Sequence, residues 1–358
     1  YSKPLTIKFL EENQFLVLDT KFFNEEFKTK LVKSINNIDE QTDGLLIHSE
    51  NFQALNLLTE RYKEQIKCIY IDPPYNAKSS AILYKNTFKH SSWLSLMENR
   101  INNSNKLLCA EPIYIIAIDE NEHESLGGLI EILFPAYNKT CVTVIHNPGG
   151  IQGSNFSYSN DFAFFIYPDK PNMIHSVKRE ESNIESLRDW GGDDSVRSSA
   201  KNCFYPIYVT QDNKIVDFGD VADDNYHPLV NERLANNIIA VYPIDENGVE
   251  RKWRYARQSI ESIRQQLLCK ERGGIKFIQN EKSFFRLKTV WDDKKYNSNV
   301  FGSKILNNII KNCPFDFPKS LFTVSDSIFS CTNNVSCVLD FFAGSGTTGH
   351  AVINLNRE

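Results

Sequence analysis

Residues 67–76, Lys-Cys-Ile-Tyr-Ile-Asp-Pro-Pro-Tyr-Asn, constrain the fold more than any other part of this chain. The apolar run over residues 68–71 is β-branched and aromatic and does not alternate with polar residues, which is typical of a strand buried on both faces of a parallel sheet. The run therefore predicts an α/β fold. Asp72 falls at the carboxyl end of this strand, at the edge where open α/β sheets bind their ligands.

The tetrapeptide Asp72-Pro73-Pro74-Tyr75 combines a carboxylate, a stiff main chain and an aromatic ring. The two prolines have a fixed φ and lack an N–H group, so a helix does not absorb the carbonyls of this loop. The carboxylate and one free carbonyl could together grip an NH2 group, and the ring could stack on a planar ligand. A nucleobase with an exocyclic amino group would suit both the two acceptors and the aromatic ring. The alternative, for the tetrapeptide alone, is an ordinary turn that ends the strand.

A second motif, Gly344-Ser-Gly346-Thr-Thr-Gly349, stands near the end of the sequence between a short strand over 338–339 and a helix through Val352 and Leu355. Glycines in such a turn let a ligand approach main-chain N–H groups at a helix start. By itself, this glycine pattern is weak evidence for any particular ligand, and it also suits a fold that binds nicotinamide dinucleotides. A P-loop is disfavoured because no Gly-Lys-Ser/Thr follows.

The position of the glycine turn decides between these interpretations. A nicotinamide fold places this turn after its first strand and needs a long βαβ unit beyond it, but few residues follow here. We therefore expect the strand at 338–339 to join the sheet built around Asp72, so that both loops share one edge. An acidic residue about 20 positions after the glycines, which would hold a ribose, is missing before Glu358. We expect the native chain to continue and to supply it.

The rest of the sequence predicts an N-terminal helical segment (residues 1–43), a first part of the catalytic domain (44–169), an inserted region (170–301) and a cofactor-binding part (302–358). The expected strands cover 44–48, 113–118, 140–145 and 162–166, and the expected helices cover 25–35, a segment capped by Ser49-Glu50-Asn51, 93–108, 122–134, 303–310 and a stretch after Lys319. His90 and Trp93 should begin and pack the helix over 93–108 rather than contact DNA. Residues 147–153 should form a mobile loop, and Asp119 and Glu120 are either solvated acids or site residues.

The inserted region reverses its charge along the chain. Residues 181–250 carry 5 Lys or Arg and 14 Asp or Glu, whereas residues 251–304 carry 14 and 5. The basic part interleaves its cations with aromatic side chains, as a surface that grips a nucleic-acid backbone would. The alternative is a solvated surface whose charges pair with the acidic neighbour.

Composition sets broader limits. The chain of 358 residues is 41% hydrophobic, has a net charge of −5 and contains no apolar run of membrane-spanning length. Its eight cysteines include no Cys-x-x-Cys pair and its seven histidines are dispersed, so we expect reduced thiols and propose no metal site. The sequence begins at Tyr1 without a leader, and we expect a soluble cytoplasmic protein with a trimmed start.

Asp72-Pro-Pro-Tyr followed much later by Asp340-Phe-Phe-Ala-Gly344-Ser-Gly346 resembles the DNA amino-methyltransferases of the permuted β order, in which the catalytic motif precedes the recognition domain and the cofactor motif comes last. Arg188-Asp-Trp-Gly-Gly192, residues 200–206 and Phe317-Pro-Lys319-Ser are most similar to the modification subunits of Type III restriction systems. The resemblance covers most of the chain and is weakest over residues 1–43.

This resemblance implies a Rossmann-like S-adenosylmethionine-dependent enzyme in which residues 170–301 form an inserted target-recognition region. It also implies that the enzyme methylates N6 of a flipped adenine at a specific site in double-stranded DNA, within a restriction-modification system. Asp72 and the Pro73 carbonyl would accept hydrogen bonds from the amino group, Pro74 would stiffen the loop, and Tyr75 would stack on the base. The residues that match the family's cofactor positions are Asp340, Phe342, Gly344, Gly346, Thr347 and, near the methionine carboxylate, Lys319. Glu50 and Asn51 are further expected cofactor-binding residues, because they stand where the family has Gly-Asp-Asn. Glu50 departs from that pattern, since its side chain is one methylene longer.

Several alternatives stay open at the level of the sequence. The acceptor could be cytosine N4, since both acceptors are exocyclic amines, or the chain could be an inactive DNA-binding specificity subunit. A nicotinamide dehydrogenase is the least favoured interpretation. The resemblance also implies possible partners, namely a restriction subunit and a second copy of the chain.

Overall fold

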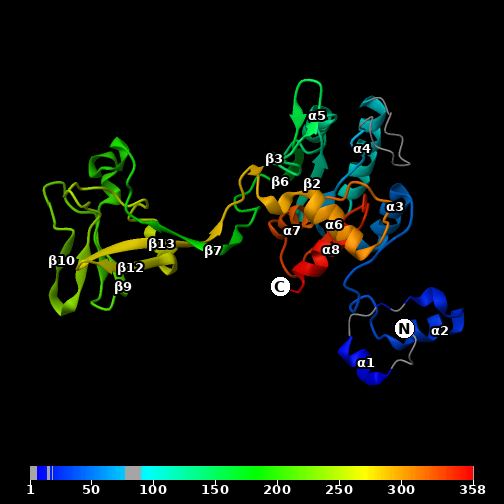
Figure 1. Ribbon diagram of the computed structural model, residues 1–358, viewed down its shortest axis with the longest axis horizontal. Helices are drawn as coiled ribbons and strands as arrows, with labels where there is room; N and C mark the ends of the chain where they lie inside the picture. The colour runs from blue at the N-terminus through cyan, green and yellow to red at the C-terminus, as the bar shows by residue number, and fades with distance from the viewer. Residues whose placement is uncertain (1–5, 14–16, 18, 77–89, 358) are drawn as a thin grey trace. The chain divides into compact units, whose positions relative to one another are not determined.

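The computed structural model describes residues 6–13, 17, 19–76 and 90–357 and divides into two compact units, residues 1–54 and 55–358. We describe each unit by itself (Figure 1). Residues 77–89, within the expected first part of the catalytic domain, and some positions of the expected N-terminal segment lie outside the described residues. Among the helices that are described, none is long and apolar enough to cross a membrane.

The first unit contains short helices, as predicted for the N-terminal segment. They are α1 (Ile7–Glu12), the 3₁₀ turn η1 (Thr20–Phe22), α2 (Glu25–Ser34) and the first turn of α3 (Asn51–Tyr62). Glu50 caps α3, because its Oε2 accepts a hydrogen bond from the Phe52 N–H at 2.8 Å. The strand expected over residues 44–48 is not formed. That prediction was wrong because Leu45 and Leu46 are 60% and 87% exposed, and an apolar pair becomes a strand only where a neighbouring strand buries it.

The second unit is built on a six-stranded sheet with the order β14-β3-β6-β2-β1-β15. Its strands are β1 (Ile66–Ile71), β2 (Leu108–Ile118), β3 (Tyr137–Val144), β6 (Asp161–Pro168), β14 (Val290–Trp291) and β15 (Cys337–Leu339). β1 is parallel to both of its neighbours, and Ile69 pairs with Leu339 on one side and Tyr114 on the other. The predicted strand before Asp72 is confirmed, and so is the prediction that the C-terminal strand joins the same sheet.

Helices cover both faces of this sheet (Figure 1). They are α3, α4 (His90–Asn105) and α5 (His123–Leu133) against one face, and α7 (Leu321–Phe329) and α8 (Thr347–Leu355) against the other, with α6 (Lys304–Ile309) preceding α7. In β1, Ile69 and Ile71 face the first group of helices, whereas Cys68 and Tyr70 face the second. All four side chains are at most 2% exposed, which explains the continuous apolar run. The expected helix over 93–108 ends earlier, at Asn105, because Leu108 begins β2.

β6 departs from the parallel rhythm and runs antiparallel to both β2 and β3. The connection from β3 to β6 holds a small hairpin, β4 (Ile151–Gln152) paired with β5 (Ser157–Tyr158), and antiparallel neighbours need no helical crossover. The expectation of a loop without any element at 147–153 was therefore wrong at β4. As a consequence, β6 starts at the edge where β1 and β2 end.

The inserted region forms two further sheets. One has the order β12-β13-β7, from β12 (Leu267–Arg272), β13 (Ile275–Phe285) and β7 (Val177–Ser186); the other has the order β10-β11-β8-β9, from β10 (Asn231–Arg233), β11 (Ile239–Val241), β8 (Ile207–Val209) and β9 (Ile215–Phe218). Short helical turns are found at Asp193–Ser195, Arg197–Ser199, Lys201–Cys203, Ala235–Asn237, Ile260–Gln266, Lys294–Tyr296 and Asn299–Ser303. Both sheets contribute to one core around Trp253 and Tyr205. Trp291, by contrast, pairs with β3 and packs in the core of the main sheet.

The two charge blocks of the inserted region pair with each other. Arg251 lies 2.8 Å from Asp245, and Arg254 and Lys282 lie 3.1 and 2.7 Å from Glu185. Weaker pairs join Arg264 to Asp217 at 3.6 Å and Lys252 to Asp189 at 3.9 Å. These contacts support the alternative in which the basic part neutralises its acidic neighbour.

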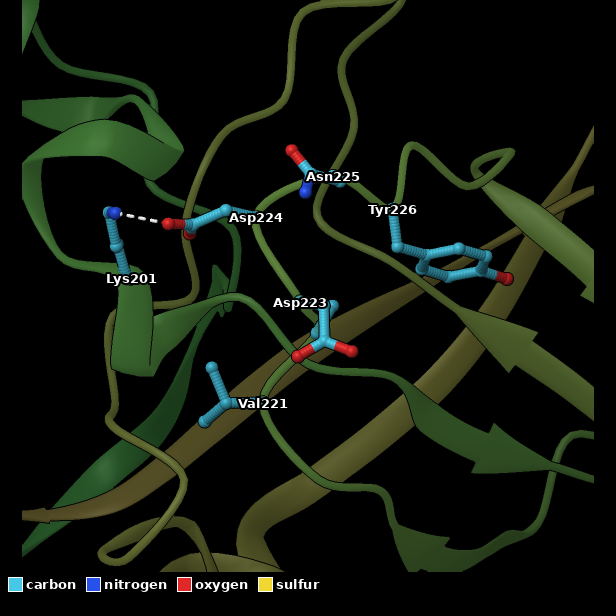
Figure 2. Close-up of a pocket in the computed structure, with 7 residues that line it drawn as sticks. Lys201, Val221, Asp223, Asp224, Asn225 and Tyr226 are labelled. Carbon is cyan, nitrogen blue, oxygen red and sulfur yellow. Dashed lines mark hydrogen bonds and ion pairs between the residues drawn. The ribbon is translucent and has the colours of Figure 1, made fainter.

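Arg197 holds a loop at residues 222–226 through its buried guanidinium group, and the whole residue is only 7% exposed. Its nitrogens donate to the carbonyls of Ala222, Asp223 and Tyr226 at 3.2, 2.6 and 2.8 Å, and it pairs with Glu250 at 3.1 Å. This loop and Lys201 line a depression of about 730 Å³ (Figure 2). The Lys201 ammonium lies 2.5 Å from the Asp224 carboxylate, and both side chains are exposed.

Replacing Arg197 should therefore loosen this loop. Lysine keeps the charge but cannot reproduce the fork of donors, so Arg197→Lys should cost about 1–3 kcal/mol of stability through unsatisfied carbonyls. Lys201→Ala removes only an exposed ion pair and should change stability by less than about 1 kcal/mol. Thermal unfolding measures both variants, and equal effects would contradict the assigned role of Arg197.

Candidate active site at the carboxyl edge of the sheet

The double-proline loop leaves β1 and is fixed by a buried tryptophan. Asp72 directly follows the strand, and the Trp93 indole N–H of α4 donates to the Pro74 carbonyl at 2.7 Å. Trp93 is 1% exposed, so the interpretation that it packs its helix is confirmed. Its hydrogen bond engages Pro74 and leaves the Pro73 carbonyl, the acceptor predicted beside Asp72, out of this contact.

A single lysine joins the loop to a second carboxylate. Lys319 Nζ lies 3.4 Å from Asp72 Oδ1 and 2.6 Å from Asp161 Oδ2, and 4.4 Å from the centre of the Tyr75 ring. Asp161 in turn lies 3.3 Å from His146 Nε2. Burial lowers the pKa of Lys319, but Asp161 and Asp72 more than offset this and raise that pKa above its ordinary value. Lys319 is therefore a permanent cation between two carboxylates.

The acids of this network do not titrate as exposed groups do. Burial raises the pKa of Asp72 and the charge of Asp161 raises it further, while Lys319 acts in the opposite direction. Burial also raises the pKa of Tyr75, with the carboxylates of Asp72 and Asp161 adding to the effect. Tyr75 is thus a neutral aromatic ring with a buried hydroxyl.

Gly302 lets the main chain of Pro318 and Lys319 approach closely, and this close approach allows Lys319 to reach its position. A Cβ atom on Gly302 would lie 2.5 Å from the Pro318 carbonyl oxygen and 2.9 Å from that of Lys319. The sequence analysis did not identify Gly302, Asp161 or His146. The one available signal was the connection before residues 162–166, which had no predicted helix and so indicated an antiparallel strand that begins at the site. Lys319 was predicted to contact the cofactor. In the structure its ammonium contacts the loop formed by Asp72–Tyr75, and the cofactor contact stays a prediction.

The glycine turn is built around the carboxylate of Asp340, which directly follows β15. Its oxygens accept hydrogen bonds from the Phe342 N–H at 2.9 Å and the Thr348 hydroxyl at 2.6 Å. Gly344 and Gly346 have φ values of 51° and 81°, a left-handed conformation that favours glycine. Gly346 is the N-cap of α8 and provides no side-chain hydrogen bond to the helix. The main-chain N–H groups in the first turn of α8 therefore receive no side-chain cap from Gly346.

The parallel pairing of β1 with β15 brings the two motifs to one edge of the sheet, as the sequence predicted. Asp72 lies close enough to Asp340 that its charge raises the pKa of that residue, although burial is the larger cause. Asp119 ends β2 at the same edge, and burial raises its pKa to about 6. Its carboxylate accepts hydrogen bonds from the Asn121 N–H at 3.0 Å and the side-chain amide at 2.7 Å, so Asp119 serves a local turn.

The remaining predicted cofactor residues differ in their surroundings. Phe342 is 9% exposed and packs in the core beside Phe341. The Thr347 hydroxyl lies 3.1 Å from that of Ser345 within the turn. Glu50 and Asn51 belong to the first unit, at the start of α3, and their cofactor role stays a prediction. Within the described residues, no group of His, Cys, Asp or Glu side chains is arranged to hold a metal ion, and all eight cysteines are free.

The sequence of this chain also matches a known protein family. A family model described as DNA methylase, of the N6/N4 methyltransferase type, matches residues 66–358. The chain belongs to this family of DNA methylases.

The chain is also similar to individual proteins of known type. The chain is 26% identical over 365 residues to the Type II methyltransferase M.KpnI of Klebsiella pneumoniae, covering 93% of this chain and 82% of that protein. It is 24% identical over 379 residues to the Mod subunit of the Type III restriction-modification enzyme EcoPI of Escherichia phage P1, covering 89% of this chain and 56% of that subunit. The chain thus spans about half the length of the Mod subunits that it matches. A crystal structure of the M1.HpyAVI-SAM complex covers 87% of this chain and 88% of that chain, with 13% identity and a TM-score of 0.38.

The burial of Asp340 predicts a measurable pH dependence of stability. Burial raises its pKa to about 6, whereas in the unfolded chain it is about 3.9. Between these values the folded state binds more protons than the unfolded state, so the stability contributed by this group falls as pH rises from about 4 to 6. Asp340→Asn removes this dependence. The stability of wild type relative to the variant should fall by about 1–3 kcal/mol across that window in urea unfolding. A difference that does not change with pH would contradict the raised pKa of Asp340.

Proposed function

We propose that this chain transfers a methyl group from S-adenosylmethionine to N6 of an adenine flipped out of double-stranded DNA, as part of a cytoplasmic restriction-modification system. The observation that carries the proposal is the meeting of Asp72-Pro73-Pro74-Tyr75 and the glycine turn on adjacent parallel strands. One motif is suited to a planar base with an amino group and the other to a ligand at a helix start. Membership of the DNA methylase family supports this assignment.

The contacts of the Asp72–Tyr75 loop support the roles that we propose for its residues. The Asp72 carboxylate and the Pro73 carbonyl accept hydrogen bonds from the two amino hydrogens, which turns the nitrogen lone pair toward the methyl donor. The Lys319 ammonium lies 3.4 Å from the Asp72 carboxylate and holds it in place. The Tyr75 ring stacks on the extruded base. The amino nitrogen loses a proton when it becomes methylated, and the raised pKa makes Asp72 a stronger base than an exposed aspartate.

The glycine turn fits S-adenosylmethionine. A Cβ atom on Gly346 would meet no atom within 4 Å, so the space above the turn is open, and α8 begins without a side-chain cap. Gly344, Gly346 and Thr347 would hold the cofactor through main-chain N–H groups, which are favourable for a negatively charged carboxylate or a hydroxyl. When bound, S-adenosylmethionine supplies a methyl group on a positively charged sulfur.

The inserted region is the proposed DNA-reading part of the chain. The base must leave the duplex at a cost of a few kcal/mol, so an enzyme of this kind needs contacts to DNA outside its pocket. Similarity to Mod subunits of Type III enzymes supports a restriction subunit as a partner, and a second copy of the chain is a further possible partner. The competing functions are methylation of cytosine N4 and DNA binding without catalysis.

One variant tests the central role directly. Asp72→Ala should reduce methyl incorporation into DNA by at least about 100-fold, because a positioned acceptor is lost from the reacting group. Its affinity for S-adenosylmethionine, measured by calorimetry, should stay within a few-fold of wild type. Asp119→Asn is a matched control, since it alters another acid at the same edge whose hydrogen bonds are local. Retained activity in Asp72→Ala would exclude the proposed role.

The product identifies the function. Digestion of the treated DNA followed by mass spectrometry should yield N6-methyladenine, whereas N4-methylcytosine would select the alternative acceptor. Binding of DNA without incorporation of labelled methyl groups would select the inactive specificity subunit. Sequencing of the methylated positions would also give the recognition site.

A second prediction concerns the acid side of the pH profile. Asp72 acts as a carboxylate, so kcat/KM should fall as pH falls through its raised pKa. Asp161→Asn removes a neighbouring negative charge that raises this pKa, and it also leaves Lys319 free to pair with Asp72 alone. The acid limb of the profile should therefore move to lower pH in this variant. A limb that stays in place or moves upward would contradict the proposed network.

A further inference from the structure

Glu122 is a fully buried acid that the proposed mechanism does not use. It directly precedes α5 and is 0% exposed. Its Oε1 accepts a hydrogen bond from the Asn76 side-chain amide at 2.7 Å and lies 2.8 Å from His90 Nδ1. One carboxylate oxygen thus joins three separate segments of the catalytic domain.

The two partners of Glu122, Asn76 and His90, both lie in segments that hold the Asp72–Tyr75 loop in place. Asn76 immediately follows Tyr75 and has a φ of 59°, a left-handed conformation in which the loop leaves the site. His90 is the first residue of α4, the helix whose Trp93 donates to the Pro74 carbonyl. Glu122 therefore links the end of the loop to the helix that holds its middle.

The cost of this arrangement argues against a purely structural role. Glu122 Oε2 is buried and has no hydrogen-bond partner among the described residues. A buried polar atom without a hydrogen-bond partner is unfavourable for folding, so Oε2 offsets part of the stability that the contacts of Oε1 provide. Features that oppose stability in this way are found mainly at functional sites.

We propose that Glu122 is a positioning residue for the Asp72–Tyr75 loop, an inference that rests on the proposed methyl transfer. The loop is then held at three points: Lys319 at Asp72, Trp93 at Pro74 and Glu122 at Asn76. The third contact fixes the direction in which the chain leaves Tyr75. Displacing a reacting group by about 1 Å can cost a factor of about 100 in rate, so a loosened loop should affect turnover more than binding.

The test compares Glu122→Met with Glu122→Gln. Methionine removes both acceptors while keeping the volume, so kcat should fall about 10- to 100-fold. The KM for S-adenosylmethionine should stay within about threefold. The unfolding temperature should change little, because loss of the acceptor for the Asn76 amide is offset by removal of the unsatisfied Oε2. Glutamine keeps one acceptor oxygen for Asn76 and should restore part of kcat. Glu131→Gln, on the same helix but at an exposed pair with Lys139, should behave as wild type.

A measurement independent of activity completes the test. In hydrogen exchange of the free protein, Glu122→Met should speed exchange at the main-chain amides of Tyr75 and Asn76. Exchange in the strands of the sheet should stay as in wild type.

The possible results separate the two proposals. Wild-type kcat in Glu122→Met, or unchanged exchange at Tyr75 and Asn76, would overturn the role of Glu122. A fall in unfolding temperature with faster exchange throughout the domain would also overturn it, in favour of a structural role. An inactive wild-type enzyme would instead remove the proposed function, and the exchange experiment would still decide whether Glu122 holds the loop.

Discussion

The site depends on one contact, the parallel pairing of β1 with β15. Ile69 pairs with Leu339, although the two strands lie at opposite ends of the second unit's sequence. Parallel neighbours end at the same edge of a sheet, so this pairing alone brings Asp72 and the glycine turn together. Helices against both faces then bury the strand, which makes the relative position of the two loops a property of the core.

The same pairing concentrates negative charge at one edge. Asp72, Asp161 and Asp340 all lie there, and Lys319 is the cation that contacts two of them. Burial raises the pKa values of Asp72 and Asp340, so the fold bears an electrostatic cost where the chemistry is proposed. Buried acids with raised pKa values beside a charged partner are common at catalytic sites, and they also occur in structural ion-pair networks.

The inserted region shows how a sequence pattern can have two meanings. Its reversal of charge suggested a surface for a nucleic-acid backbone, but several of its cations pair with acids of the neighbouring block. The fold of this region therefore uses much of its charge internally.

The sequence by itself determined the buried strand before Asp72, the stiff loop, the glycine turn and the fact that both motifs belong to one sheet. These features are local or follow from chain connectivity, so spacing and residue type suffice to predict them. Only the tertiary structure decided that β6 runs antiparallel and places Asp161 at the site, that Lys319 lies between two carboxylates, and that Glu122 joins Asn76 to His90. It also decided that residues 44–48 form no strand. The physical reason is that strand direction, strand pairing and side-chain contacts depend on segments far apart in the sequence, and residue patterns do not encode these distances.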